Sequence, residues 1–145
     1  MMRIVEYSAK VLNNSNSTDS QKEVVIRILS KIGKQILKNA FLKQQFQTLT
    51  VDYFIPLLQN ANPLLNSLTC ELLSLYLPFG TLDSAVVGRL MELIYGKITE
   101  SSYAIVNYNA ILAFTALLNH DSAFQAASPH FTSILQIYTK MINSF

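Results

Sequence analysis

The chain has 145 residues, of which 50% are hydrophobic and only 14% are charged, and its formal net charge is +2. This length suffices for one domain core, and the charged fraction is well below the roughly 25% of an average soluble domain. Four glycines and four prolines are too few for a fold rich in strands and turns, so we expect a helical protein with large apolar faces.

The N-terminal stretch MMRIVEYSAK carries charges inside a short apolar run, so we expect no secretory signal. The single cysteine, Cys70, cannot form an intramolecular disulfide and is expected in the core. Both observations favour a reducing compartment. Charge is uneven: residues 1–43 hold eight Lys or Arg against three Asp or Glu, and residues 44–145 hold three against six.

Apolar spacing predicts a short helix over residues 2–12, followed by the low-complexity loop NNSNSTDS. Asp19 or Ser20 should cap a second helix that reaches residue 38. Its apolar stripe consists of Val25, Ile28, Leu29, Ile32 and Ile36. A third helix is expected over residues 42–59, where Pro56 should introduce a kink or remove one hydrogen bond.

Asn62 and Pro63 are typical of a helix start, and the helix that they begin should end at Pro78. Another helix is expected over residues 83–98. The next stretch, SSYAIVNYNAILAFTALLNH, has the length of a membrane span and no charge. However, Asn107 and Asn109 would be costly in hydrocarbon, and no basic cluster flanks the stretch.

We therefore predict no membrane span but a helix over residues 103–118 that protein covers on nearly every side. Leu112 and Phe114 should both be buried there, so Asp at either position should unfold the chain. A short helical turn at residues 121–127 and a last helix from Ser128 to residue 143 complete the prediction.

The predicted helix starts near residues 20, 63 and 103 are about 40 residues apart, and each helix is followed by a second one. Three antiparallel pairs, at about 20–59, 63–98 and 103–143, are typical of a HEAT or armadillo-like α-solenoid. We expect a single all-α solenoid segment with right-handed superhelical progression, preceded by the helix at 2–12. An ordinary helical bundle could imitate this period.

Four stretches carry a more specific order of residues: KEVVIRILSKIGKQIL, VDYFIPLLQNANPLLNSLTCELLSLYLPF, AVVGRLMELIYGKI and VNYNAILAFTALLNH. In this order they resemble the middle of receptors of the importin-beta (karyopherin-beta) superfamily. Phe54-Ile55-Pro56-Leu57 matches the family's aromatic-x-Pro-Leu element, and Thr69-Cys70 stands where the family often has Ala-Cys. The resemblance covers residues 20–143.

Within the superfamily, the chain is most similar to the branch of ribosomal-protein and histone importers and the export receptor for importin-alpha. Asn66 and Asn107 depart from the pattern, because the family often has Arg at comparable places. A ladder of Asp and Arg is also not evident, since only Asp83 and Arg89 are available in the middle pair. Family members are several times longer, so the resemblance implies a central piece of a longer chain.

The resemblance implies a segment of a nucleocytoplasmic transport receptor that moves between cytoplasm and nucleus. Its expected partners are protein cargo, the GTPase Ran and the Phe-Gly repeats of nucleoporins. The alternative is a HEAT-repeat scaffold subunit of a phosphatase-regulatory or vesicle-coat type, and a plain helical bundle is the third possibility.

Motifs for chemistry are absent from the sequence: there is no Gly-rich phosphate loop, no metal-spaced Cys/His set and no Ser/His/Asp arrangement. His120 and His130 are expected as surface or cap residues. We therefore expect neither an enzyme nor a cofactor or metal.

Candidate partner-binding residues lie on two predicted helices. A basic strip is formed by Arg27, Lys31, Lys34 and Lys38, with Lys43 nearby. It is either a solvated helix face or a site for an acidic protein partner. Direct nucleic-acid binding is not expected, because no aromatic residues interleave. On the helix at 83–98, the residues Arg89, Glu92 and Tyr95 are expected to point outward, either to a partner or only to solvent.

The two terminal helices carry more apolar positions than one buried face needs. These positions are Ile4, Val5, Tyr7, Val11 and Leu12 in the first helix, and Phe131, Ile134, Leu135, Ile137, Tyr138, Met141 and Ile142 in the last. Interior repeats of a solenoid leave such faces for the next repeat to cover. We therefore expect exposed, sticky ends and self-association.

Overall fold

The computed structural model describes residues 2–14, 16–38, 46–78 and 82–143. Throughout these ranges the regular elements are helices, without a strand, which confirms the all-α class. In chain order they are α1 (Met2–Asn13), α2 (Asp19–Lys38), α4 (Phe46–Leu49), the π-helical turn η1 (Thr50–Phe54), α5 (Ile55–Leu58), α6 (Pro63–Tyr76), α7 (Ser84–Glu100), α8 (Ala104–Leu117), α9 (Asp121–Ala127), the 3-10 turn η2 (Ser128–His130) and α10 (Phe131–Asn143).

Most predicted boundaries lie within two residues of the observed ones. The last predicted helix differs, because a 3-10 turn at Ser128–His130 precedes its α-helical part. The helix predicted over 42–59 is described from Phe46 onward, and residues 42–45 lie outside the described part of the chain.

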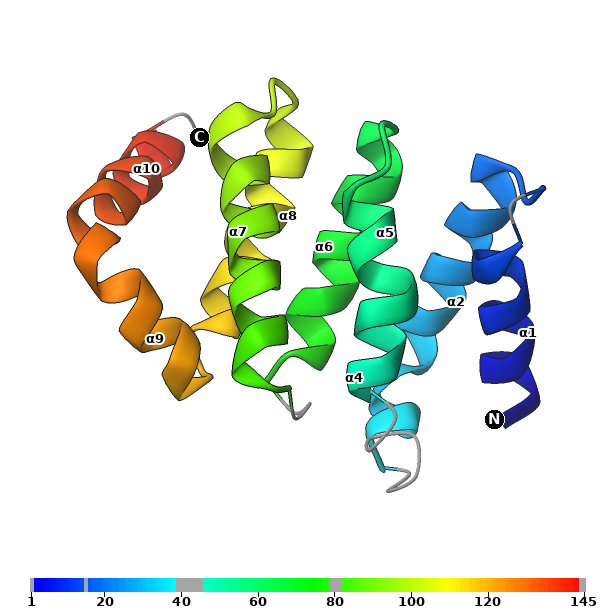
Figure 1. Cartoon of the computed structure of the whole chain (residues 1–145). Helices are drawn as coiled ribbons and strands as arrows, with labels where there is room; N and C mark the ends of the chain where they lie inside the picture. Colours follow the sequence, from blue (N-terminus) through cyan, green and yellow to red (C-terminus); the bar gives the residue numbers. More distant parts are fainter. Residues whose placement is uncertain (1, 15, 39–45, 79–81, 144–145) are drawn as a thin grey trace.

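The helices alternate between two rows (Figure 1). In one row α6 packs against α2 on one flank and against α8 on the other. The second row holds α1, the composite helix α4–η1–α5 and α7, with α1 against η1 and α5 against α7. Side-by-side packing of the helices that start near residues 20, 63 and 103 is what the repeat interpretation requires.

Contacts between the rows join α5 to α6 and α7 to α8. The predicted pairs 20–59, 63–98 and 103–143 would instead join α2 to α5, α6 to α7 and α8 to α10. The contacts across the rows are therefore shifted by one helix along the chain. That division into pairs stays a prediction.

One continuous apolar core runs through both rows, from α2 to the start of α10. Tyr76 joins the two helices α2 and α6, because its hydroxyl donates to the Leu29 carbonyl at 2.9 Å. The Tyr76 ring packs edge-on against Phe54 at a centroid distance of 6.4 Å. Gly33 permits this approach, since a Cβ there would lie 3.1 Å from the Tyr76 ring.

The predicted stripe of α2 is largely correct. Val25 and Leu29 are buried, while Ile28 and Ile32 are half-buried. Ile26 is also buried, which the predicted stripe did not include. The side chain of Ile36 lies outside the described part of the structure.

Pro56 alters the helix locally, as predicted, and the alteration takes the form of a π-helical turn. Proline has no N–H, and its ring collides with the carbonyl four residues earlier in an α-helix. The turn before it, Thr50–Phe54, is π-helical, and the Ile55 N–H reaches back five residues to the Thr50 carbonyl. The wider turn makes room for the proline while the helix continues through Ile55–Leu58.

Helix α8 is covered on fewer sides than its sequence predicts. Phe114 is buried as expected, with 1% of its surface exposed. Leu112 is 39% exposed, so the prediction that it is buried is wrong. Ile105 and Tyr108 are also exposed and share this outer side of α8 with Leu112. Within the described residues, no helix combines the length and apolar character needed to cross a membrane.

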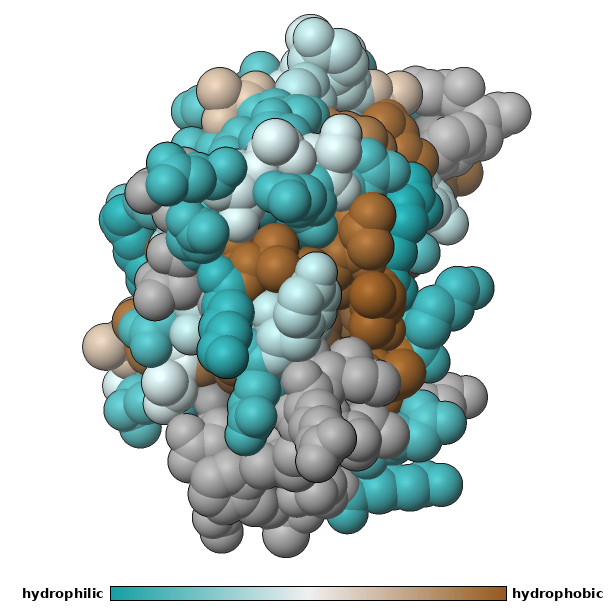
Figure 2. All heavy atoms as spheres, turned by 90° about the vertical axis from the view of Figure 1, so that its right-hand side faces the viewer, coloured by the Kyte–Doolittle hydropathy of each residue, from teal (hydrophilic) through white to brown (hydrophobic). Residues whose placement is uncertain are grey.

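Both ends of the rows leave apolar side chains in solvent. Figure 2 looks onto the end formed by α1 and α2, where a hydrophobic area adjoins charged side chains. Val24 of α2 is 55% exposed. At the other end, Leu135 and Ile142 of α10 are 64% and 71% exposed. The side chains of Ile4, Val5 and Met141, which also entered the prediction of sticky ends, lie outside the described residues.

Candidate functional site

Two asparagines hold the turns at one edge of the molecule. The Asn66 Nδ2 donates to the carbonyls of Leu57, Leu58 and Asn60 at 2.9–3.2 Å, which ties the start of α6 to the end of α5. Carbonyls at the end of a helix lack the full set of intrahelical donors, so the carboxamide supplies a further donor here. Asn66 itself is buried.

Asn107 repeats this arrangement one unit later. Its Nδ2 donates to the carbonyls of Lys97, Ile98 and Ser101 at 2.9–3.2 Å, which ties the start of α8 to the end of α7. The two asparagines are the positions where the sequence departs from the family's frequent Arg. We call these two bonding patterns the asparagine clamps.

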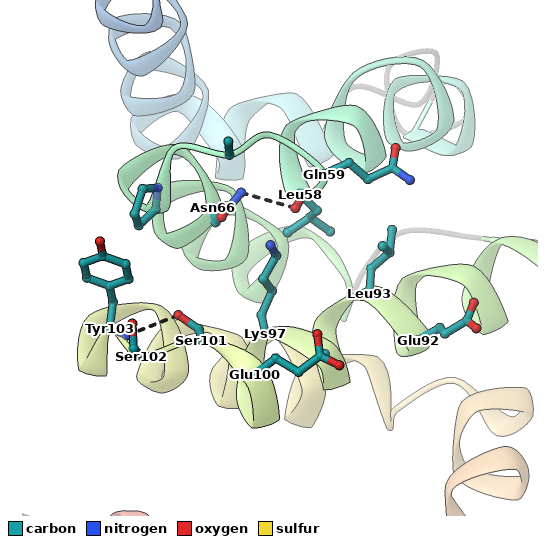
Figure 3. Close-up of a pocket in the computed structure, with 13 residues that line it drawn as sticks. Leu58, Gln59, Asn66, Glu92, Leu93, Lys97, Glu100, Ser101, Ser102 and Tyr103 are labelled. Carbon is teal, nitrogen blue, oxygen red and sulfur yellow. Dashed lines mark hydrogen bonds between the residues drawn. The ribbon is translucent and has the colours of Figure 1, made fainter.

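A groove of about 630 Å³ lies between the two clamped turns (Figure 3). One wall consists of the turn at 59–63 with Leu58 and Asn66, and the other of the C-terminal half of α7 with residues 101–103. We call it the turn groove. Its walls are polar and apolar in about equal parts, and its edges carry the exposed side chains of Gln59, Glu92 and Glu100.

Lys97 is the charged group that reaches into the turn groove from α7 (Figure 3). It is half-buried and forms no ion pair with any carboxylate of the described residues. The charge of Lys97 affects the pKa of a core residue, Cys70. Burial raises the pKa of the Cys70 thiol to about 12, and the Lys97 ammonium opposes that shift. Cys70 is therefore a neutral, buried core residue, as predicted.

The predicted basic strip lies on α2, away from this groove. Arg27, Lys31 and Lys38 are exposed, and Arg27 pairs with Glu23 through Nη2 and Oε1 at 3.0 Å. The Lys34 side chain and the whole of Lys43 lie outside the described part of the chain. Exposure fits either reading of the strip, so its role as a partner site stays a prediction.

The predicted group on α7 divides between solvent and core. Arg89 and Glu92 are exposed and lie 3.7 Å apart. Tyr95 does not point outward, because it is half-buried and its ring packs against Phe114 at a centroid distance of 6.3 Å. Of the predicted site residues, Glu92 is among those that line the turn groove. Sequence reasoning missed Lys97, whose place in the groove depends on residues about 35 positions earlier.

A second candidate surface is the solvent-exposed side of α6 and α8. It carries exposed apolar and aromatic side chains with the exposed Glu71 among them, and its apolar members are Leu64, Leu75, Tyr103, Ile105, Tyr108 and Leu112. We call it the outer face. Exposed apolar residues gathered on adjacent helices are typical of protein-binding surfaces.

Among the described residues, no three His, Cys, Asp or Glu side chains come together in a group that could hold a metal ion. His120 has a structural role, because its Nε2 lies 2.9 Å from the Leu77 carbonyl and joins the end of α8 to the end of α6. The His130 side chain lies outside the described residues. No family model matches the chain, and neither a curated protein nor a solved structure matches it.

Proposed function

We propose that the chain is a protein-binding segment of a HEAT-type α-solenoid, and that the longer protein is a nuclear transport receptor of the importin-beta type. The repeated asparagine clamp carries this proposal. Asn66 and Asn107 are 41 residues apart, and the Nδ2 of each donates to three backbone carbonyls at equivalent turns. A repeating unit of about 40 residues is the length of a HEAT or armadillo repeat.

The outer face supports a role in binding apolar peptide side chains. Its exposed Leu, Ile and Tyr residues lie on α6 and α8, which pack side by side. Phe-Gly repeats of nucleoporins offer isolated phenylalanines that would fit between such residues, and protein cargo or Ran would use other surfaces of the longer receptor. The proposed location is therefore the cytoplasm and the nucleus, with passage through the nuclear pore.

Direct binding tests the proposal. A fluorescein-labelled peptide with four Phe-Gly repeats should bind the chain, and the same peptide with Ser in place of Phe should not. Tyr108→Ser combined with Leu112→Ser should weaken binding at least fivefold, because both changes remove apolar surface from the outer face. Leu135→Ser combined with Ile142→Ser is the matched control on α10. Equal binding of the Phe and Ser peptides would reject the transport assignment in favour of a scaffold subunit.

A further inference from the structure

Gly96 keeps the turn groove open beside Lys97. A glycine inside a helix destabilises it by roughly 1 kcal/mol relative to alanine, and Gly96 has no packing reason to be glycine. A Cβ at this position would meet only the Glu100 Oε2, at 3.9 Å. Gly33 differs, since a Cβ there would press on the Tyr76 ring. Gly96 lines the turn groove, and its missing side chain therefore leaves space there.

Lys97 carries a positive charge in the groove and has no ion-pair partner among the described residues, although the carboxylates of Glu92 and Glu100 also line the groove. Lys97 is half-buried, so its field is screened less than that of an exposed lysine. The nearest acidic residues on the same helix do not neutralise it: Glu92 is exposed and lies beside Arg89, and Glu100 forms no ion pair. A carboxylate supplied from outside is the complement that this position lacks.

The groove suits an extended chain better than a small molecule. A small-molecule site encloses most of its ligand within apolar walls. Here the walls are half polar, and side chains of the two turns such as Gln59 and Ser102 are exposed. An extended peptide carries N–H and C=O groups along its length that can pair with such side chains, while one of its own side chains enters the groove.

We propose that the turn groove binds an extended segment of a partner protein, with a Glu or Asp side chain paired to Lys97. This proposal rests on the proposed protein-binding function and uses a groove centred on α7, which shares Tyr103 with the outer face. Gly96 acts as the opening through which the acidic side chain reaches Lys97, and a side chain at this position would close it.

A peptide library tests the groove. Terminally blocked heptapeptides on beads, with random flanks and a fixed central Glu, are screened against the 145-residue chain, beside the same library with a central Gln. Selected Glu peptides should bind at least tenfold more tightly than their Gln counterparts in fluorescence polarisation. A screen without any Glu-dependent binder overturns the proposal.

Variants then locate the bound peptide. Lys97→Met should weaken binding at least tenfold, and Lys97→Glu should reverse the preference toward peptides with a central Lys. Gly96→Leu should abolish binding by filling the groove. Gly88→Leu is the matched control, because it lies on the same helix and a Cβ there meets nothing within 4 Å. Circular dichroism checks that each variant folds. Undiminished binding by folded Gly96→Leu would overturn the proposal.

The two proposals fail separately. If the chain binds the Phe-Gly peptide but no Glu peptide, the groove proposal is overturned and the transport proposal stands. If Glu peptides bind in a manner that requires Lys97 and the Phe-Gly peptide does not bind, the groove proposal stands and the transport proposal fails.

Discussion

The centre of the two rows and their ends place polar and apolar groups in opposite ways. At the centre, polar side chains are buried and bonded: the Asn109 Nδ2 of α8 donates to the Ser67 Oγ of α6 at 2.7 Å. At the ends, apolar side chains such as Leu135 and Ile142 are exposed. Buried polar bonds fix how one helix lies on the next, whereas the exposed apolar side chains at the ends do not fix a neighbour in this way. The position of a helix in this molecule therefore depends on the helices that pack against it as much as on its own sequence.

The largest expected effect comes from placing a charge on the two sides of α8. Phe114→Asp should destabilise the chain by more than about 4 kcal/mol, because it buries an unpaired carboxylate and removes a core aromatic ring. Leu112→Asp is the matched control on the exposed side and should cost below about 1 kcal/mol. Urea unfolding followed by circular dichroism measures both. Equal destabilisation would mean that both sides of α8 are covered.

The asparagine clamps give the next largest effect. Asn66→Leu removes the side-chain donor to the carbonyls of Leu57, Leu58 and Asn60 and should lower the free energy of unfolding by about 2–4 kcal/mol. Asn107→Leu should cost about 1–2 kcal/mol, because Asn107 is only half-buried and water can replace part of the bond. Asn119→Leu, which removes a single side-chain bond to the Ala116 carbonyl, is the control. Equal destabilisation by Asn119→Leu and Asn66→Leu would contradict a greater contribution of the asparagine clamps to stability.

Alkaline pH should weaken the centre through Cys70. Its pKa is about 12 in the folded chain against 9.0 for the free group, so the unfolded chain loses its proton first. Stability is unaffected by this group below pH 9 and falls by up to about 1.4 kcal/mol per pH unit between 9 and 12. The free energy of unfolding of the chain and of Cys70→Ala, measured at pH 8, 9 and 10, gives the contribution of the Cys70 thiol. Parallel curves for the two proteins would contradict a raised thiol pKa.

The smallest effect on stability is expected at the end of the rows, where association should change instead. Leu135→Lys with Ile142→Lys should shift the free energy of unfolding by less than about 0.5 kcal/mol, since both side chains are exposed. Sedimentation at increasing concentration should show weaker self-association than in the unaltered chain. Thr132→Lys with Gln136→Lys adds the same charge without removing apolar surface. If this control reduces self-association equally well, charge and not the apolar surface of α10 governs association.

Helix positions were predictable from the sequence because apolar spacing and start signals are local. Asn62 and Pro63 mark the start of α6 in the sequence, and the Asn62 side chain accepts a bond from the Leu64 N–H as a cap does. The exposure of Leu112 was not predictable. Helix α8 is apolar all round, so its sequence does not indicate which side lacks a neighbour.

The candidate site was less accessible to sequence reasoning. Asn66 and Asn107 stood out only as departures from a family pattern, although their spacing of 41 residues matches the repeat. Lys97 and Gly96 gave no signal, because the groove forms only when the turn at 59–63 lies beside α7. Tyr95 was placed outward because helix periodicity does not reveal how far a long aromatic ring can fold back onto Phe114.

The π-helical turn at Thr50–Phe54 makes this helix tolerant of a change in length. A π turn closes its hydrogen bond over five residues and an α turn over four, so the segment holds one residue more than an α-helix requires. Deleting the exposed Val51, together with Pro56→Ala to remove the ring collision, would restore α-helical bonding while Leu57 and Leu58 keep facing the core. The same deletion in α6 would rotate every later side chain by about 100°. Related chains that differ by one residue in length are thus expected to carry the difference here.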